Sequence, residues 1–467
     1  MDTNTSGKTS RSDYWEATYA DGSAHSYKYE EKWVDDLINP ELVGLKIPEG
    51  AVKIEYLRLG ICHKLESIHF PSSLLEIGRI MIANENCLQS ITVDEDNPKY
   101  SARKDILYTK DKSKLVRFHN KRDVSHFSIL PEVHEIGQRA FENCQYLHTL
   151  EIPCSVTSIG EGAFLNCQNL EELILPNSVE SFSMKAISSC HRLKRIYLLT
   201  NIKELTDLEI KGCEALNRFY VDVTNQNFSS ADDVIFNKDK TTLVRYPPNK
   251  AGNSYTIPES VLIIGDYAFG NCENLTNIKL PRGLKYISEG AFEGCRKLES
   301  INIPDKVEII RYHVFAGCYN LREITIPRSV KRIESFVFDS CQSLTSINVD
   351  ENNLYYKSAD GVIYSKNNKT LVRYPPGKTD STFHIPAGVT TINESAFKNC
   401  VNLTRITVPN SVKTIQSLAF SYCSNLQEIN IPANTTSIYP YAFDYCPLLK
   451  NLKGDAGNEG LPIQKIL

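Results

Sequence analysis

The chain has 467 residues and a formal net charge of −4. This balance excludes a globally basic surface of the kind that binds nucleic acid. The sequence has no apolar run of 18 or more residues, so no membrane span is predicted, and residues 1–30 lack a basic segment followed by an apolar one. We therefore expect no secretory signal in this chain, which leaves a removed signal or a cytosolic protein as the alternatives.

Residues 1–40 do not repeat and contain both tryptophans, Trp15 and Trp33. The stretch 29–38, YEEKWVDDLI, has the spacing of a short amphipathic helix, with Trp33 and Ile38 among its apolar residues. A solenoid needs cover for the apolar edge of its first coil. We interpret 1–40 as an N-terminal cap, with a separate functional element as the alternative.

A repeat of 23 residues organises the rest of the chain. The unit 147–167, LHTLEIPCSVTSIGEGAFLNC, follows the frame L-x-x-I-x-I-P-x-x-V-x-x-I-x-x-x-A-F-x-x-C. Further copies of the frame lie at 170–190, 298–318 and 403–423. A period of this length is typical of a solenoid. Because side chains alternate along a strand, Leu150 and Ile152 are predicted to point inward, and Pro153 ends the strand.

Three units are longer than the others and are separated by steps of 128 residues. They lie near 93–131, 221–258 and 349–386. In the second long unit, two apolar runs, 234–236 and 243–246, flank a polar turn, which is typical of a hairpin. We therefore expect three inserted β-hairpins.

Together these patterns predict an α/β-type repeat solenoid over residues 41–455. We expect stacked 23-residue coils with a ladder of short parallel strands down one side. The family resemblance given below implies in addition that the body is curved and that these strands lie on its concave face. The frame fades near Asp455, and residues 456–467 are predicted to form an irregular C-terminal tail.

Of the 14 cysteines, only Cys154 lies outside the repeat position. Most recur once per coil, as in Cys144, Cys167 and Cys190, and the sequence contains no C-x-x-C pair, so a local metal site is not expected. Free cysteine behaves as a small buried hydrophobe, which predicts a ladder of reduced thiols in the core. Stacked coils also lie within disulfide reach, so oxidation in an extracellular setting stays open.

The sequence contains no motif that indicates catalysis, a metal site or a cofactor. His69 and His384 are predicted to be surface residues on outward strand positions. Two residue types recur at fixed offsets in the long units, and we interpret the aspartates as caps of main-chain N–H groups and the arginines as packed on aromatic rings. These residues are Asp94, Asp222 and Asp350, and Arg117, Arg245 and Arg373.

The outward face of the strand ladder is mostly small and polar, with one exception. Tyrosine and arginine are common at binding hot spots, and exposed apolar clusters usually indicate contact with a partner. We therefore expect a ligand-binding patch on the concave face, although tyrosine is also an ordinary strand former. The patch consists of Glu172, Ile174, Arg195, Tyr197, Arg218 and Tyr220.

The 23-residue frame, with D-G-V-I-Y and L-V-R-Y-P-P-G-K between coils, resembles the BspA-like (Treponema pallidum-type) leucine-rich repeat family over roughly residues 42–455. The resemblance implies a curved leucine-rich-repeat solenoid. It also implies a surface or secreted protein of bacteria or mucosal protists that acts in adhesion through host-matrix or other protein ligands.

We accordingly predict a non-enzymatic protein-binding module without cofactor, located at the cell surface or secreted. An intracellular scaffold or sensor on the same solenoid is the first alternative, favoured by the missing signal and the many unpaired thiols. A carbohydrate-binding surface protein is the second alternative, and it requires an aromatic platform or clustered carboxylates. A repeat protein changes its ligand by changing surface residues on an unchanged core, so the pattern names neither the ligand nor the oligomeric state.

Overall fold

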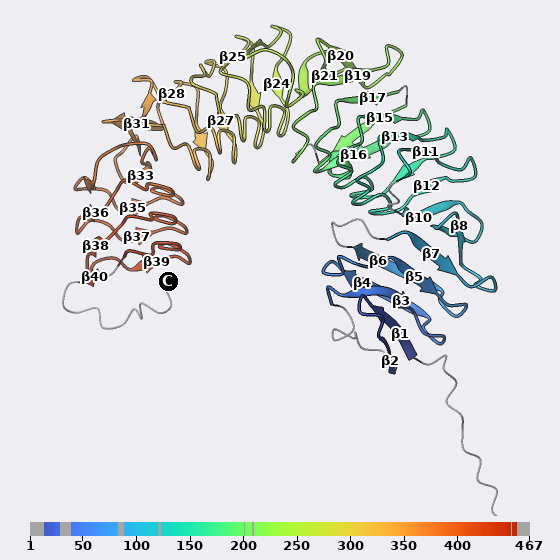
Figure 1. The fold of residues 1–467 in the computed structure, drawn as a ribbon. Coiled ribbons are helices and arrows are strands. Elements are labelled where there is room, and N and C mark those ends of the chain that lie inside the picture. Colours follow the sequence, from blue (N-terminus) through green and yellow to red (C-terminus); the bar gives the residue numbers. More distant parts are fainter. Residues whose placement is uncertain are drawn as a thin grey trace, which may run out of the picture. The chain divides into compact units, whose positions relative to one another are not determined.

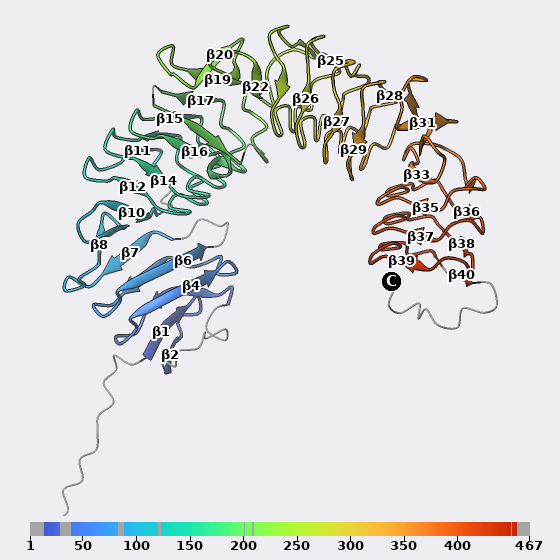
Figure 2. The same ribbon diagram turned by 180° about the vertical axis from the view of Figure 1, so that it is seen from behind.

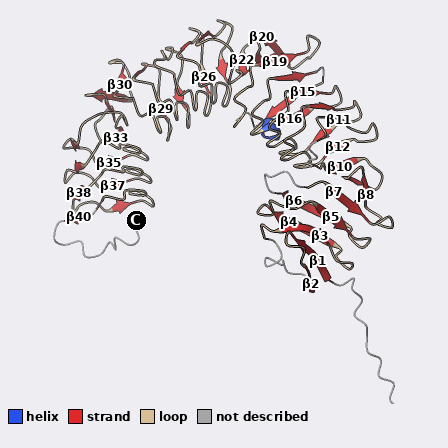
Figure 3. Cartoon of the chain, in the orientation of Figure 1, coloured by secondary structure: helices blue, strands red, loops and turns tan. Residues whose placement is uncertain are grey.

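The structure is a computed structural model that describes residues 14–28, 39–82, 88–119, 123–199, 201–207, 210–449 and 451–454. The chain divides into two compact units, 1–230 (unit 1) and 231–467 (unit 2). Both units are built from strands and turns, and the described residues contain one helical element, the 3-10 helix η2 (Met184–Ile187) (Figure 3). The predicted solenoid is therefore confirmed, but it is a β-solenoid with almost no helix and not an α/β-type one.

Each regular coil of unit 1 contributes two short strands. The strand before the proline position belongs to what we name the first ladder, and the strand formed around V-x-x-I belongs to the second ladder. The first ladder contains β3 (Leu42–Lys46), β5 (Ser67–Phe70), β7 (Ser90–Val93), β11 (His126–Ser128), β13 (Thr149–Glu151), β15 (Glu172–Leu175), β17 (Arg195–Leu198) and β19 (Arg218–Val221). The second ladder contains β4 (Lys53–Leu59), β6 (Glu76–Ile82), β10 (Lys114–Arg117), β12 (Glu135–Ile136), β14 (Ser158–Ile159), β16 (Ser181–Ser183) and β18 (Glu204–Thr206).

Unit 2 has the same two ladders. Its first ladder contains β23 (Ser254–Thr256), β25 (Asn277–Lys279), β28 (Glu323–Ile326), β30 (Ser346–Val349), β34 (Thr382–His384), β36 (Arg405–Thr407), β38 (Glu428–Ile431) and β40 (Asn451–Gly454). Its second ladder contains β22 (Thr242–Arg245), β24 (Ile263–Ile264), β26 (Tyr286–Ile287), β27 (Ile309–Ile310), β29 (Arg332–Ile333), β33 (Thr370–Arg373), β35 (Thr391–Ile392), β37 (Thr414–Ile415) and β39 (Ser437–Ile438). The short strands follow from the sequence, because the proline after a first-ladder strand cannot donate to the ladder.

The long units add strands to this pattern. These are β8 (Tyr100–Arg103), β9 (Ile106–Thr109), β20 (Phe228–Ala231), β21 (Val234–Asn237), β31 (Tyr356–Ala359) and β32 (Val362–Ser365). In each long unit the last added strand pairs antiparallel with a second-ladder strand, as β9 does with β10, β21 with β22 and β32 with β33. The three inserted hairpins are therefore present as predicted.

The two ladders of unit 1 lie on opposite sides of that unit. In Figures 1 and 2, β4, β6 and β16 lie on the inner side of the bend of unit 1, and β7 and β15 lie on its outer side. Short parallel strands therefore do line the concave side, as predicted. They belong to the second ladder, however, and not to the strands that precede the proline position.

In the coils of unit 2 that end in a core cysteine, the core contains a stacked aromatic ring beside a buried thiol. In unit 2 the rings of Phe292 and Phe315 stack with 5.6 Å between their centroids. The Sγ atom of Cys318 donates to the carbonyl of Phe292 one coil earlier, at 3.3 Å. The thirteen described cysteines are all free and only Cys154 is exposed, whereas Cys87 lies outside the described residues. The reduced-thiol ladder is the arrangement that the structure shows.

A buried asparagine ties each long unit to the coil before it. Asn353 is fully buried, and its amide donates to the carbonyls of Pro327 and Val330 at 2.9 Å each. Its side-chain oxygen accepts from the N–H groups of Tyr355 and Tyr356. Asn97 and Asn225 occupy the same position in the other long units and are equally buried. The sequence analysis did not single out these residues.

The recurring aspartates and arginines have structural partners. Asp222 and Asp350 accept from main-chain N–H groups two residues further on, which is the predicted capping role. The three arginines are buried and donate to main-chain carbonyls of the next coil, as Arg245 Nη2 does to Gly270 at 2.9 Å. These hydrogen bonds form because the turn ahead of the next cysteine presents its carbonyls to the guanidinium group. The packing of the arginines on aromatic rings stays a prediction.

The N-terminal segment contains a hairpin of β1 (Tyr14–Tyr19) and β2 (Ala24–Lys28). Strand β1 pairs antiparallel with β3, the first strand of the first ladder, and Ala17 and Tyr19 are buried in the same core as Leu45. This arrangement agrees with the role of a cap, which stays a prediction. The predicted helix at 29–38 and the predicted tail at 456–467 lie outside the described residues.

Candidate binding surface

The six residues of the predicted patch lie on three adjacent parallel strands of unit 1, β15, β17 and β19. The register joins Glu172, Arg195 and Arg218 in one row across the strands. A second row joins Ile174, Tyr197 and Tyr220. We name these two rows together the outer patch.

The outward direction of these side chains is fixed by the buried residues between them. Leu173, Ile196 and Phe219 alternate with the two rows and are 0%, 0% and 1% exposed. Because side chains alternate across a strand, this buried row holds its neighbours on the solvent side. The pairing of the six residues was thus predictable from the repeat. Their location was not: the patch lies on the outer side of the bend of unit 1, where the sequence predicted the concave side.

The charged row contains an ion pair. Arg195 Nη2 lies 2.6 Å from Glu172 Oε1, and both side chains are more than a third exposed. A surface pair of this kind contributes little to stability, about 0–1 kcal/mol. One position earlier on the same strands, Lys194 donates to Glu171 at 2.9 Å, and this hydrogen bond lowers the pKa of Glu171. The charged row thus presents two arginines beside the apolar row.

The apolar row is exposed at both of its ends. Ile174 and Tyr220 are 48% and 42% exposed, and Tyr197 between them is half-buried. The rings of Tyr197 and Tyr220 lie 5.7 Å apart between centroids in a tilted arrangement. Each tyrosine thereby limits the rotation of the other, so the row is partly ordered before any ligand binds.

The outer patch has a polar border on its N-terminal side. In β11 and β13, His126 Nδ1 and Thr149 Oγ1 lie 2.6 Å apart, and Ser128 donates to Glu151 at 2.5 Å. These residues bond to one another across the ladder. The apolar character therefore begins at Ile174.

One exposed apolar residue near the patch was missed by the sequence analysis. Val223 follows β19 and is 83% exposed. The other long units carry Glu95 and Glu351 at this position. An apolar residue where both sister copies have a carboxylate is visible in the sequence once the copies are aligned.

The outer patch consists of one carboxylate, two guanidinium groups, two phenol rings and one aliphatic side chain. It contains no cysteine, serine or histidine that could act as a nucleophile or base. Among the described residues no group of three or more metal-ligating side chains is found. No helix in the described ranges is long and apolar enough to cross a membrane.

Comparison with known proteins agrees with this architecture. The model of the BspA type leucine-rich repeat region matches residues 39–103, 115–241, 249–359 and 378–459. The chain belongs to the BspA-type leucine-rich-repeat family. Leucine-rich repeats of this family are a non-enzymatic repeat type. A search of the curated proteins found no match.

Several solved structures resemble this member of the BspA-type family. A leucine-rich repeat protein from Eubacterium ventriosum is 22% identical, with 86% of this chain and 90% of that chain covered and a TM-score of 0.46. A leucine rich cell surface protein from Faecalibacterium prausnitzii is 23% identical, with 89% and 92% covered and a TM-score of 0.42. The leucine rich repeat protein of T. pallidum is 25% identical, with 47% and 87% covered and a TM-score of 0.29.

Proposed function

We propose that this chain is a non-enzymatic protein-binding module that acts at the cell surface in adhesion or in recognition of a host or matrix protein. The observation that carries the proposal is the outer patch, where Ile174 and Tyr220 are nearly half exposed beside Arg195 and Arg218. The patch combines the residue types that dominate binding energy in protein interfaces. The family membership supports a binding role.

The two rows of the patch would act differently on a protein ligand. The ordered rings of Tyr197 and Tyr220 would pack against apolar side chains of the ligand, which supplies most of the affinity. The row of Arg195 and Arg218 borders them and would pair with carboxylates at the rim, which affects the association rate more than the affinity. We therefore expect a ligand surface with an apolar centre and acidic neighbours.

The test is a double variant, Tyr197→Ser with Tyr220→Ser, measured against a panel of purified host-matrix proteins by surface plasmon resonance. Both residues point to solvent, so the fold should be retained, which circular dichroism and thermal unfolding would check. The expected result is at least a hundredfold loss of affinity for any matrix protein that the unchanged chain binds. Tyr286→Ser removes a tyrosine that is 57% exposed on β26 of unit 2, and it should leave binding unchanged. Undiminished binding by the double variant would remove the patch from the proposal.

A second candidate function is favoured by one observation. Twelve buried cysteines are free thiols, and a chain that keeps its thiols reduced is typical of the cytosol. On that basis the same patch would serve an intracellular scaffold. Location in intact cells, probed by a membrane-impermeant biotin reagent, separates the two candidates, because only a surface protein is labelled.

A further inference from the structure

Four exposed tyrosines stand on two neighbouring coils of unit 2. Tyr422 follows β37, and Tyr439, Tyr441 and Tyr445 follow β39, which pairs in parallel with β37. In order along the chain, these side chains are 43%, 51%, 66% and 63% exposed. We name the four residues the tyrosine platform. Exposed apolar surface gathered in one place usually indicates contact with a ligand.

The tyrosines are held close to one another by a ring contact and a turn. The ring of Tyr422 stacks on the ring of Tyr445, with 4.6 Å between centroids and 16° between the ring planes. The N–H group of Asp444 donates to the carbonyl of Tyr441 at 3.2 Å. A turn closed in this way brings its first and last Cα atoms within about 7 Å. Tyr441 and Tyr445 therefore lie at the two ends of one turn, and the N–H group of Tyr422 donates to the carbonyl of Asp444 in the same turn.

The main chain at two of these tyrosines is strained. Tyr422 and Tyr445 have φ values of 58° and 52°, a region that suits glycine and asparagine but not a bulky residue. Other coils have such residues at this position, as in Gly317 and Asn399. Strained residues persist mainly where function requires the side chain, so two successive strained tyrosines indicate a role outside the fold.

The internal repeat supports the same interpretation. The equivalent positions one and two 128-residue steps earlier hold no tyrosine, although the coils there have the same frame. They hold Gly294, Arg311, His313 and Gly317 in one copy, and Asn166, Ser183, Lys185 and Ser189 in the other. Because these coils fold without tyrosine, the four rings of the platform are not needed to build a coil.

The two stretches that carry the tyrosines are nearly uncharged. Within residues 414–423 and 434–446, Asp444 is the only charged residue. A site without cations does not attract nucleic acid or a sulfated polymer, and protein-binding hot spots commonly add arginine to tyrosine. Gln416 stands one coil before Tyr439, is half-buried, and brings an uncharged amide to this side of the coil. Rings beside neutral hydrogen-bonding groups suit an uncharged sugar, whose C–H groups pack on ring faces while its hydroxyls bond to polar side chains.

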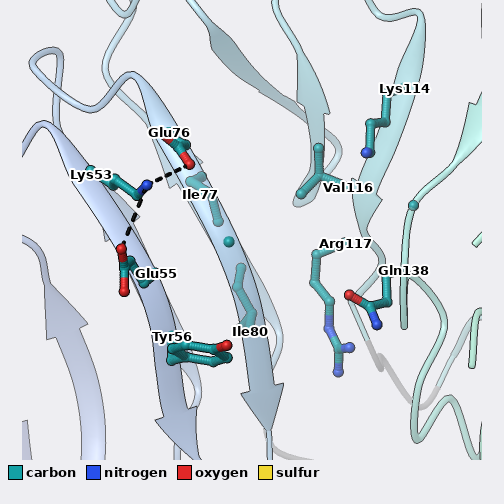
Figure 4. A pocket seen from close by; sticks show the side chains of 12 residues that line it. Lys53, Glu55, Tyr56, Glu76, Ile77, Ile80, Lys114, Val116, Arg117 and Gln138 are labelled. Carbon is teal, nitrogen blue, oxygen red and sulfur yellow. Dashed lines mark ion pairs between the residues drawn. The ribbon is translucent and has the colours of Figure 1, made fainter. Parts of the chain in front are cut away.

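A cavity in unit 1 has the opposite chemistry. Figure 4 shows this cavity, which has a volume of about 690 Å³ and is lined by Lys53, Glu76 and Lys114 among other residues. Lys53 Nζ lies 3.0 Å from Glu76, and Lys114 Nζ lies 2.6 Å from Glu135. A ligand in the cavity would lie against ion pairs, whereas a ligand on the tyrosine platform would lie against rings and uncharged groups. Of these two places, the platform is the one that suits a neutral ligand.

We propose that the tyrosine platform is a binding site for an uncharged oligosaccharide or polysaccharide. The stacked rings of Tyr422 and Tyr445 limit each other's rotation, so part of the site is ordered before the sugar binds. Tyr439 and Tyr441 extend the aromatic surface along the same coil and present further hydroxyls. The site adds to the protein-binding function proposed above, because it lies in unit 2 and takes a ligand of another class.

The experiment applies the full chain to an array of neutral, acidic and sulfated glycans and then measures the affinity of each bound glycan by calorimetry. The test variant is Tyr422→Asn with Tyr445→Asn, which introduces a residue that other coils carry at this position, so the fold should be retained. Neutral glycans should bind the unchanged chain and lose at least about tenfold in affinity to this variant. The control is Tyr312→Asn, which removes another exposed tyrosine of unit 2 and should leave the affinity unchanged.

A second measurement uses only the unchanged chain and therefore does not depend on the folding of a variant. In saturation-transfer NMR, irradiation of the aromatic protons should reach the C–H protons on one face of the bound sugar most strongly. The affinity should also be the same at low and at high salt, because a neutral ligand releases no counterions.

Four results would overturn the proposal. They are an array without any bound neutral glycan, binding only of sulfated or acidic glycans that weakens with salt, undiminished glycan binding by the double variant, and no transfer from the aromatic protons. If no glycan binds and the double variant instead loses affinity for a matrix protein, the tyrosines belong to a protein-binding surface, and the proposal is equally wrong.

Discussion

The ring of Tyr422 stacks on the ring of Tyr445 with 4.6 Å between centroids, and both residues have positive φ, 58° and 52°. Each stands directly before a core cysteine, where other coils have residues that accept this conformation. These are Asn143, Asn166, Ser189, Asn271, Gly294, Gly317, Ser340 and Asn399. A tyrosine in this conformation costs about 1–2 kcal/mol, while a ring pair contributes about 0.5–1.5 kcal/mol.

We predict that changing both tyrosines to asparagine raises the free energy of unfolding by about 1 kcal/mol, because two strained residues are relieved and one ring contact is lost. Tyr445→Asn alone should be nearly neutral, since it relieves one residue and also removes the ring contact. Urea unfolding of the full chain and its variants measures both effects. A double variant that is less stable than the unchanged chain would show that the ring pair outweighs the strain.

The buried Asn353 predicts a second stability effect. Asn353→Ala removes four hydrogen bonds and leaves the carbonyls of Pro327 and Val330 without this donor in the core. Since an unsatisfied buried group costs about 1–3 kcal/mol, we expect a loss of at least about 3 kcal/mol in the free energy of unfolding. The neighbouring Asn352 is exposed, so Asn352→Ala should change stability by less than about 0.5 kcal/mol. Similar losses of unfolding free energy in the two variants would contradict the idea that Asn353 ties the long unit to the coil before it.

The repeat made the core and the register predictable. A frame of 23 residues determines which side chains meet across a parallel ladder, so Tyr197 and Tyr220 could be paired from their spacing alone. The free thiols followed from the same spacing, because a residue that recurs once per coil lies in one column. These inferences need only the period and the alternation of side chains along a strand.

The side of the bend could not be predicted in the same way. The direction of bending depends on the relative separation of the two ladders, and the frame showed only one strand per coil clearly, since second-ladder strands such as Ser158–Ile159 have two residues. The role of Asn353 was also hidden, because an asparagine in a polar stretch normally indicates a loop.

The buried thiols predict how stability changes at high pH. Burial raises the pKa of Cys272, Cys341 and Cys400 from 9.0 to about 12. A thiol whose pKa is higher in the folded chain than in the unfolded chain contributes its full stability below pH 9, and this contribution is lost as the pH rises toward 12. In this window each such thiol lowers the free energy of unfolding by about 1.4 kcal/mol per pH unit.

The test replaces these three cysteines by alanine and compares the slopes of unfolding free energy between pH 9 and 11. The variant should be less stable at neutral pH, since small cavities form, but its slope should be shallower by about one proton per replaced thiol. Cys154 is exposed, so Cys154→Ala opens no core cavity and should change the stability at neutral pH by less than about 0.5 kcal/mol. Equal slopes in the unchanged chain and the triple variant would show that these thiols already ionise in the folded chain.

In unit 2, Asp339 lies beside Lys398 and Arg373, which stand further along the chain, so we predict that Asp339 is important for stability. Asp339 is 7% exposed, accepts from Lys398 at 2.5 Å and lies 4.0 Å from Arg373 Nη2. Asp339→Asn leaves two largely buried cations without their carboxylate, so we expect a loss of about 3 kcal/mol in the free energy of unfolding. The matched control is Asp305→Asn, since Asp305 pairs with Arg328 at 3.5 Å on an exposed surface and should matter by less than about 0.5 kcal/mol. Thermal unfolding at two salt concentrations measures both variants. If the effect of Asp339→Asn were as small and as salt-sensitive as that of Asp305→Asn, water would reach the ion pairs of Asp339. These ion pairs would then not hold the coils together.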